Sequence, residues 1–370
     1  MPPRYPAPTI ETKAGEWRKV EILLDGVSVS RLWIVDRDMR IGAAVLKTAG
    51  IAGVGTDRKH RKRGLALRVL ERSIQLMHEE EYDASFLYGI QDFYHRVGFA
   101  TCFAQHGFSV DTRKAEAVRS PLRTRLITQA DFGQVRSLYE RQNRDRTGSV
   151  VRQRRWKDFV MGSGFGVSHA TVVVYKPGAR KRVLGYVHYD NVDDRCRAAE
   201  VGGQGDAVIG AIMRYLGERS VLLRRERVSF SCPNDHPVAV YARRLGYQDE
   251  TRYERNAGAM GRSLHLPRFL TALIPELERL WPAEAPSRLV IRCGDEAATL
   301  LRRKEKVSVS TRSSGHGLQI VDTGVMMQLV MGYRDVDDAE SGVSGSAREL
   351  DLARALFPLR VGHMWWPDRF

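Results

Sequence analysis

The chain has 370 residues, of which 43% are hydrophobic, so it is long enough to bury sizeable cores and to form two or three domains. Its formal net charge of +15 and pI of about 9.9 favour anionic partners, nucleic acid among them. No apolar run is long enough to span a bilayer, and the N-terminus lacks a signal-peptide pattern. The four cysteines are far apart in the sequence, which argues against a disulfide framework or a structural zinc site and fits a reducing cytoplasm.

The first hundred residues have an α/β pattern. An Asp25-Gly26 turn between apolar runs predicts a β-hairpin, and residues 40–55 continue the sheet. Apolar residues at helical spacing predict a helix from Gly64 to about Glu80. A strand at 84–88 and a short helix at 91–97 follow, so strand and helix alternate as in an α/β fold.

The loop before the first helix is basic and contains glycine. It ends in Arg61-Lys62-Arg63-Gly64-Leu65-Ala66. Backbone N–H groups at a helix N-terminus lack intrahelical partners, and the helix dipole favours negative charge there. The small residues Gly64 and Ala66 let a phosphate approach the backbone. The loop therefore predicts a phosphate site, while a solvated basic turn or a basic cluster that touches nucleic acid are the alternatives.

The order of elements then repeats in part. A charged segment with Pro121, residues 113–123, is predicted to be a linker. After it, helix and sheet patterns occur at 131–144, 170–175, 183–189, 206–216 and 227–230. Arg244-Leu245-Gly246-Tyr247 echoes Arg96-Val97-Gly98-Phe99, but Ala242 stands where Tyr94 does. The loop at 200–206 has no basic residue, so this second copy has lost both the basic phosphate loop and the tyrosine.

The chain from about residue 257 has a third, mixed α and β pattern. It predicts a helix at 266–281, strands at 287–293, 306–311 and 317–321, and helices at 323–331 and 349–355. An aromatic C-terminus with Trp365 and Trp366 closes the chain, and both tryptophans are expected to be packing anchors.

Two motifs resemble those of the GNAT superfamily of N-acetyltransferases. Arg61-x-x-Gly64-x-Ala66 resembles the acetyl-CoA pyrophosphate loop, and Tyr94-x-Arg96-x-Gly98-Phe99 resembles a second family element. The three parts together resemble the enhanced intracellular survival (Eis) type, further supported by Leu138–Arg141, Arg152, Trp156 and the aromatic C-terminus. This resemblance implies tandem GNAT folds, the second degenerate, plus a sterol-carrier-protein-like α/β domain, with boundaries at 1–118, 119–256 and 257–370.

The resemblance also implies site residues. The enzyme would transfer acetyl from acetyl-CoA to a primary amine by direct attack, with no acyl-enzyme and no metal. Tyr94 matches the proton donor to the CoA thiolate, and the carboxylate of Phe370 matches the general base. Gly89 and Ile90 would line the acetyl end. The pantetheine arm would bind Val54, Gly55 and Thr56, and the pyrophosphate Arg61, Lys62, Arg63, Gly64, Leu65, Ala66 and Leu67.

These roles agree with the chemistry of amide formation. An amine attacks only when neutral, so a base is needed, and burial would raise the carboxylate's ordinary pKa of about 3.5. A thiolate whose thiol has a pKa of about 8.5 takes a proton readily from a phenol of pKa about 10. The alternative for Tyr94 is a core residue with a satisfied hydroxyl, and the alternative for Phe370 is an ordinary chain end.

Two features depart from the family. The segment before Val20 is shorter than the strand and two helices usual there, which predicts an acceptor cleft that is more open, or that another part of the chain or a partner subunit closes. The basic charge argues against polycationic aminoglycosides, unless an acidic patch forms from Glu79, Glu80, Glu81, Asp92 or Asp368. A non-catalytic CoA-binding or scaffold protein is the alternative to an enzyme. Nucleic acid is a disfavoured partner, no membrane contact is expected, and the resemblance allows a homo-oligomer.

Overall fold

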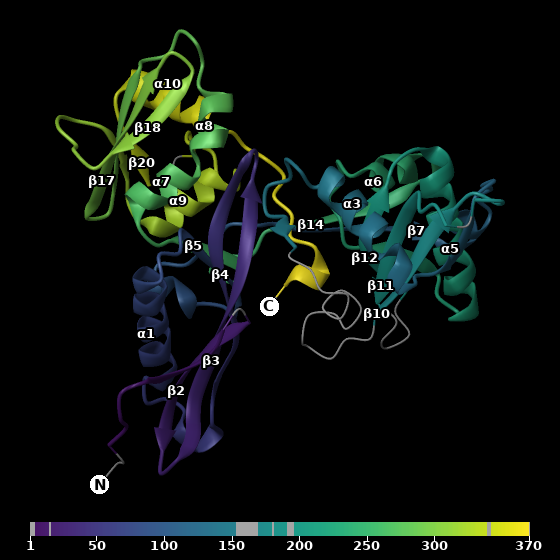
Figure 1. Cartoon of the computed structure of the whole chain (residues 1–370), viewed down its shortest axis with the longest axis horizontal. Helices are drawn as coiled ribbons and strands as arrows, with labels where there is room; N and C mark the ends of the chain where they lie inside the picture. Colours follow the sequence, from purple (N-terminus) through teal and green to yellow (C-terminus); the bar gives the residue numbers. More distant parts are fainter. Residues whose placement is uncertain are drawn as a thin grey trace. The chain divides into compact units, whose positions relative to one another are not determined.

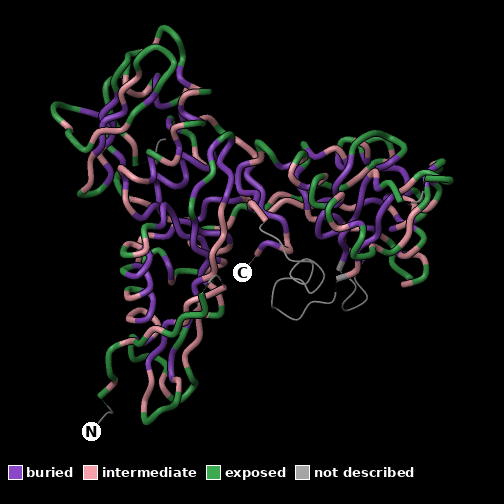
Figure 2. Tube along the Cα trace, viewed as in Figure 1, coloured by how far each residue is buried: buried purple, intermediate pink, exposed green. Residues whose placement is uncertain are grey.

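The computed structural model describes residues 4–14, 16–152, 169–179, 181–190, 196–338 and 342–369 (Figure 1). The chain divides into two compact units: unit 1 holds residues 1–103, 254–362 and 370, and unit 2 holds residues 104–253 and 363–369. Buried residues run through both units (Figure 2). Within the described ranges, no helix combines the length and apolar character needed to cross a membrane.

The first sheet of unit 1 is built mainly from the N-terminal hundred residues. Its strands lie in the order β1-β2-β3-β4-β5-β15-β6. Their bounds are Thr9–Lys13, Trp17–Leu24, Val27–Ile41, Ala44–Thr56, Ala84–Gly89, Gly258–Ser263 and Ala100–Thr101. Asp25 and Gly26 have φ of 52° and 78°, and two successive positive φ values match a type I′ turn, which confirms the predicted hairpin. The strand β1 was not predicted; it pairs antiparallel with β2.

Helix α1, Leu65–Glu79, packs against β2, β3 and β4 (Figure 1). Its buried face includes Leu65, Val69, Leu70, Ile74 and Met77, and these belong to one hydrophobic cluster with Ile22, Leu32 and Ile34 of the sheet. The spacing of that apolar face produces the amphipathic helix, which confirms the sequence prediction.

The C-terminal part of unit 1 has its own sheet. Its strands lie in the order β18-β17-β16-β19-β20, with bounds Lys306–Ser310, Glu296–Arg303, Arg288–Cys293, Leu318–Ile320 and Val343–Ser344. The helices are α7 Leu266–Ala272, α8 Ile274–Leu280, α9 Thr323–Val330 and α10 Ala347–Leu356. The single helix predicted at 266–281 is wrong: it breaks at Leu273, because Pro275 has no N–H to continue the α7 ladder.

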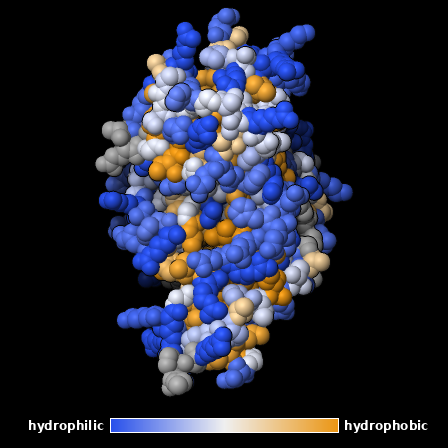
Figure 3. Space-filling model, turned by 90° about the vertical axis from the view of Figure 1, so that its left-hand side faces the viewer, coloured by the Kyte–Doolittle hydropathy of each residue, from blue (hydrophilic) through white to orange (hydrophobic). Residues whose placement is uncertain are grey.

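Side chains of this C-terminal part hold it to the first sheet of unit 1. Glu276 of α8 accepts a hydrogen bond from Ala43 N at 2.9 Å, at the turn between β3 and β4. Gln328 of α9 donates to Thr101 O at 2.8 Å. Most side chains on the face drawn in Figure 3 are hydrophilic, and hydrophobic ones are scattered among them.

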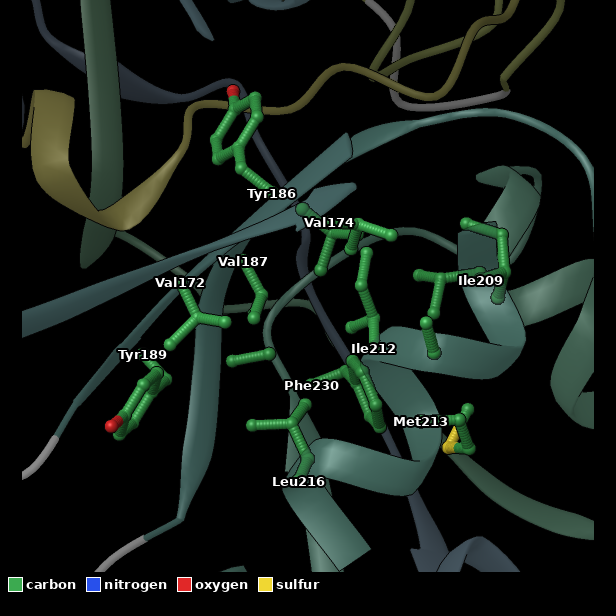
Figure 4. Packing of buried hydrophobic residues seen from close by; sticks show 14 of the residues in the cluster. Val172, Val174, Tyr186, Val187, Tyr189, Ile209, Ile212, Met213, Leu216 and Phe230 are labelled. Atoms are coloured by element: carbon green, nitrogen blue, oxygen red, sulfur yellow. The ribbon is translucent and has the colours of Figure 1, made fainter. Parts of the chain in front are cut away.

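Unit 2 contains a second sheet of similar order. Its strands lie in the order β14-β7-β13-β12-β11-β10-β8, with bounds Tyr247–Arg252, Gln105–Asp111, Arg227–Phe230, Arg197–Gly203, Gly185–Asp190, His169–Tyr175 and Arg123–Leu126. The other elements are α2 Thr112–Glu116, α3 Phe132–Gln142, β9 Val150–Val151, α5 Asp206–Leu222 and α6 Pro237–Ala242. Figure 4 shows Ile209, Ile212 and Leu216 of α5 beside Val172 and Val187 of the sheet, in one buried cluster.

Two strands lie in sheets that the predicted domain boundaries do not assign to them: β7 falls in the predicted segment 1–118 but joins the sheet of unit 2, and β15 falls in 257–370 but joins the first sheet of unit 1. The strand β7 precedes α2 in the chain but pairs between β13 and β14, and β15 pairs between β5 and β6. The linker predicted at 113–123 is also partly wrong, because Asp111 caps α2 by accepting from Arg113 N at 2.9 Å and Lys114 N at 3.2 Å. The division into three domains stays a prediction.

Candidate functional site

The parallel strands β4 and β5 of unit 1 separate partway along their length, and this separation is called the β4–β5 splay below. The strands β4 and β5 pair from Thr48↔Ala84 to Ile51↔Leu87, and β4 then continues to Thr56. It stays paired with β3 on its other side as far as Ser30↔Thr56. Backbone groups of β4 that face β5 beyond Ile51 are therefore outside the described ladder, and such groups need hydrogen-bond partners. A ligand arm can supply these partners, since ligands of α/β sheets bind at the carboxyl ends of the strands.

A β-bulge changes the course of β4 at this point. Its pairing with β3 shifts between Arg31↔Gly55 and Trp33↔Ala52, so β4 carries one extra residue. Gly53 has φ of 57°, and a Cβ atom there would lie 2.7 Å from Cε3 of Trp33. Both the backbone angle and the close ring require glycine. The sequence analysis missed Gly53 and Trp33, and the glycines of the 51–55 segment were the available signal.

The predicted phosphate loop leads directly from β4 into α1. Gly64 is the N-cap of α1 with φ of 73° and ψ of 6°, and no described side chain caps this helix end. Leu65 is 2% exposed and anchors the first turn in the core. The N–H groups at the start of α1 therefore have no described side-chain acceptor, and an anionic ligand could take that place.

The loop before α1 carries exposed positive charge. Asp57 caps the 3₁₀ helix η1, Arg58–His60, by accepting from Lys59 N at 2.9 Å. Arg61 donates from Nε to Thr56 O at 3.2 Å, which ties the loop to the end of β4. Among the described residues, no ion-pair partner occurs for the exposed basic residues Arg58, Lys59, Arg61, Lys62 and Arg63. The loop can thus attract and bind a phosphorylated ligand.

The N-terminal segment braces this loop. The Tyr5 hydroxyl and His60 Nδ1 are hydrogen-bonded at 2.8 Å. Arg68 of α1 donates to Pro6 O at 2.5 Å, and the Arg63 guanidinium lies 5.8 Å from the centroid of the Tyr5 ring. Residues ahead of β1 therefore help to fix the phosphate loop, a role that the sequence analysis did not assign.

Tyr94 lies just beyond the end of β5. It begins the 3₁₀ helix η2, Tyr94–Val97, which Gly98 closes with φ of 78°. Tyr94 is 6% exposed, and its ring makes a T-shaped contact with the Phe93 ring at 4.9 Å between centroids. Burial raises the pKa of the Tyr94 phenol. No hydrogen bond to its hydroxyl occurs among the described groups, unlike the satisfied core tyrosine of the alternative interpretation.

The structure brings Gly89 and Tyr94 together. A Cβ atom at Gly89 would lie 2.7 Å from Cδ2 of Tyr94 and 2.7 Å from Sδ of Met260. Met260 comes from β15, which pairs with β5 at Leu87. Ile90, the other residue predicted at the acetyl end, is 69% exposed. Phe370 and Trp156 lie outside the described residues.

Within its described residues, the second copy differs from the first at the equivalent helix N-terminus. The N-terminus of α5 carries Asp206, which pairs with Arg244, and its N-cap is Gly205. The strands β12 and β13 are paired at Arg197↔Ser229 and Ala198↔Phe230, and β12 continues to Gly203. The N–H of Gly203 is already bound by Gln142 Oε1 at 2.9 Å. The Gln142 side chain thus binds a backbone N–H of β12, whereas the backbone groups of β4 past Ile51 that face β5 have no described partner.

Metal-binding clusters and surface hollows are two other kinds of potential site. In the described part of the chain, no group of three or more His, Cys, Asp or Glu side chains could hold a metal ion. A hollow of about 760 Å³ lies in the C-terminal part of unit 1, beside β19, β20 and α10. Asp337 lines this hollow, and its carboxylate pairs with the Arg354 guanidinium at 2.7 Å. The residues that line this hollow include none of the predicted site residues.

Comparison with known proteins agrees with this geometry. Residues 13–102 match the family model of the acetyltransferase (GNAT) domain, and this range contains the splay, the basic loop and Tyr94. Comparison with curated protein sequences gives no match.

Solved structures match nearly the whole chain. A GCN5-related N-acetyltransferase from Anabaena variabilis is 15% identical with a TM-score of 0.76, over 95% of this chain and 89% of that one. One from Kribbella flavida is 16% identical with a TM-score of 0.75, over 95% and 87%. Eis1 from Mycobacterium abscessus is 16% identical with a TM-score of 0.67, over 97% and 92%. Residues 13–102 therefore form a GNAT acetyltransferase domain, which makes the protein an acyltransferase, and the whole chain has the fold of these solved N-acetyltransferases, that of Eis1 included.

Proposed function

We propose that the protein transfers the acetyl group of acetyl-CoA to a primary amine by direct attack in a ternary complex. The observation that carries this proposal is the β4–β5 splay past Ile51, with the uncapped, basic N-terminus of α1 after β4 and the buried Tyr94 after β5. A long ligand with phosphates at one end and a reactive thioester at the other suits this combination.

The residues of the site fit acetyl-CoA. The pyrophosphate would lie on the N–H groups at the start of α1, with charge from the neighbouring basic loop; these residues are Arg61, Lys62, Arg63, Gly64, Leu65, Ala66 and Leu67. The amides of the pantetheine arm would pair with the open edge of β4 at Val54, Gly55 and Thr56. Gly89 and Ile90 would line the acetyl end.

The reaction needs two proton transfers. The amine nitrogen attacks the acetyl carbonyl carbon, the carbon–sulfur bond breaks, and the thiolate takes a proton from the Tyr94 hydroxyl. Because burial raises its pKa, Tyr94 is protonated at neutral pH and available as a donor. The proton lost by the amine goes to a base, and the proposed base is the terminal carboxylate of Phe370.

The acceptor is proposed to carry few positive charges. The chain has a formal net charge of +15, which repels polycations at long range. Two of the carboxylates that could form an acidic patch are already paired, Glu79 with Arg72 at 2.9 Å and Glu80 with Arg18 at 2.7 Å. This arrangement disfavours aminoglycosides and supports monoamines or amines that also carry a carboxylate.

A thiol-release assay with acetyl-CoA tests the proposal. The panel contains an arylalkylamine, an amino acid amide, a lysine peptide, a polyamine and an aminoglycoside. We expect turnover with at least one monoamine, and Tyr94→Phe serves as the control for chemistry at this site. Binding of CoA with no thiol release from any amine would contradict the enzyme and favour the non-catalytic CoA-binding alternative.

A further inference from the structure

The short helix η2, which carries Tyr94, ends in contact with side chains from distant parts of unit 1. The N–H of Gly98 donates to His95 O at 3.0 Å, within this helix. The N–H of Phe99 donates to Tyr94 O at 3.3 Å. The carbonyl groups of Val97 and Gly98 come after the last turn, so the helix itself supplies no donors for them. Their partners come from β15 and α9.

The Val97 carbonyl accepts a hydrogen bond from Nη1 of Arg262 on β15. Arginine side chains often bind the last carbonyl groups of a helix in this way. The Arg262 guanidinium also lies 6.0 Å from the centroid of the Phe99 ring. Met260 stands two residues earlier on β15, so the two side chains project from the same face of the strand. Met260 belongs with Tyr94 and Phe99 to one hydrophobic cluster. The strand β15 thus supports the Tyr94 element with one apolar and one charged side chain.

The first turn of α9 binds the Gly98 carbonyl. The Thr323 hydroxyl donates to Gly98 O at 3.4 Å. The two segments approach closely, because a Cβ atom at Gly98 would lie 3.0 Å from Thr323 Oγ1. A Cβ atom at Gly324 would lie 2.8 Å from Ala100 Cβ. Residues 98–100 therefore lie directly against the start of α9.

Two carboxylates balance the charge of Arg262. Burial lowers the pKa of its guanidinium, and the carboxylates of Glu296 on β17 and Asp322, the N-cap of α9, oppose this lowering. Backbone groups fix both carboxylates. Glu296 accepts from Leu266 N at 2.7 Å, and Asp322 accepts from Val325 N at 2.8 Å. The cation at the end of η2 is therefore part of a fixed arrangement of charges.

The position of Tyr94 depends on its ring packing and on the backbone of η2, because its hydroxyl has no described hydrogen-bond partner. Misplacement of a catalytic group by about 1 Å can cost about a hundred-fold in rate. We infer that Arg262 and Thr323 are positioning residues for Tyr94, because they fix the backbone of η2 by binding its terminal carbonyl groups. This inference rests on the proposed function, in which Tyr94 is the proton donor.

Two variants and one control separate this role from ordinary stabilisation. Arg262→Lys keeps the charge but loses the planar donor group, and Thr323→Val keeps the shape but loses the hydroxyl. The control is Arg302→Lys in the C-terminal sheet. Arg302 also donates to a backbone carbonyl, Pro282 O at 2.7 Å, but this carbonyl belongs to the segment before β16 and not to η2.

The first measurement is amide hydrogen exchange of residues 94–101 in the folded full-length protein, followed by mass spectrometry. The N–H groups of Gly98 and Phe99 exchange when η2 opens. Loss of the charge-assisted hydrogen bond should raise their exchange rate about ten-fold in Arg262→Lys. A smaller rise is expected in Thr323→Val and none in Arg302→Lys. Unchanged exchange in both variants would overturn the inference. If Arg262→Lys does not fold, the exchange rate of Thr323→Val decides.

The second measurement is steady-state acetyl transfer. We expect kcat of Arg262→Lys to fall about ten-fold, with KM for acetyl-CoA within about two-fold of wild type, because the phosphate loop is unchanged. In the Tyr94→Phe background the same substitution should not lower the residual kcat further, since two changes that act through one group are not additive.

Equal falls of kcat in both backgrounds would show that Arg262 does not act through Tyr94 and would overturn the positioning role. A wild-type protein without acetyl transfer would instead refute the proposed function. The exchange rates would then still decide whether Arg262 and Thr323 fix η2.

Discussion

The ring of Tyr94 packs so closely on Gly89 that a Cβ atom at position 89 would lie 2.7 Å from Tyr94 Cδ2. Gly89→Ala should therefore displace the ring and its hydroxyl. Misplacement of a catalytic group by about 1 Å can cost about a hundred-fold in rate, so kcat should fall by about that factor while CoA affinity stays near wild type. Thiol release and calorimetric CoA binding measure the two quantities. Gly133→Ala is the control, since nothing lies within 4 Å of a Cβ atom there.

Removing only the hydroxyl of Tyr94 tests its role as a proton donor. No described group bonds this hydroxyl, so Tyr94→Phe should leave the free energy of unfolding almost unchanged. Loss of a general acid typically lowers the rate by about 100- to 10,000-fold, and kcat should fall within that range. Because burial raises the pKa of Tyr94, wild-type kcat should not decline on the alkaline side until above pH 10. Equal activity of Tyr94→Phe and wild type would make Tyr94 a core residue.

Local patterns predicted the parts of the site that lie close together in the chain. The loop from Ile51 to Ala66 leads into α1, and the Tyr94 element follows β5, as the sequence indicated. Helix periodicity, the Asp-Gly turn and the glycine-containing loop all act over a few residues, so these predictions needed no tertiary information.

Features that depend on distant residues could not be predicted. Met260 contacts Gly89 because β15 pairs with β5, although these strands are more than 160 residues apart in sequence. The pairing of β7 between β13 and β14 and the bulge at Gly53 likewise depend on partner strands that local propensity does not specify. The break between α7 and α8 at Leu273 was predictable, because Pro275 lies inside the helical pattern and a proline there indicates that a helix ends or kinks just before it.

Charge removal in the phosphate loop should weaken CoA binding selectively. The exposed side chains of Arg61 and Arg63 have no described ion pair, so replacing both with Gln removes two charges without exposing a buried partner. Charge-assisted hydrogen bonds contribute about 1.5–3 kcal/mol each, so affinity for CoA should fall at least ten-fold. Pantetheine lacks phosphates, and its affinity should not change. Equal weakening for both ligands would indicate a distorted loop instead of lost phosphate contacts.

Acid should destabilise unit 2 through its buried histidines. His236 is 2% exposed, and its Nδ1 accepts from Val238 N at 3.3 Å as the N-cap of α6, which requires a neutral ring. Burial lowers the pKa of His236 to about 3, and it also lowers the pKa values of His363 and His106.

In the unfolded chain these histidines titrate near pH 6.5, so below that pH the unfolded state binds protons that the folded state does not. The free energy of unfolding should thus fall as the pH is lowered from about 6.5 towards 3, by about 1.4 kcal/mol per pH unit from His236, and His363 and His106 add to this fall because their pKa values are also lowered. Urea unfolding followed by tryptophan fluorescence between pH 7.5 and 5 measures this slope, because Trp365 contacts both His236 and His363. Asn also caps helices but does not titrate, so His236→Asn should reduce the slope by the share of one histidine. An unchanged slope in that variant would show that His236 does not contribute to the acid sensitivity.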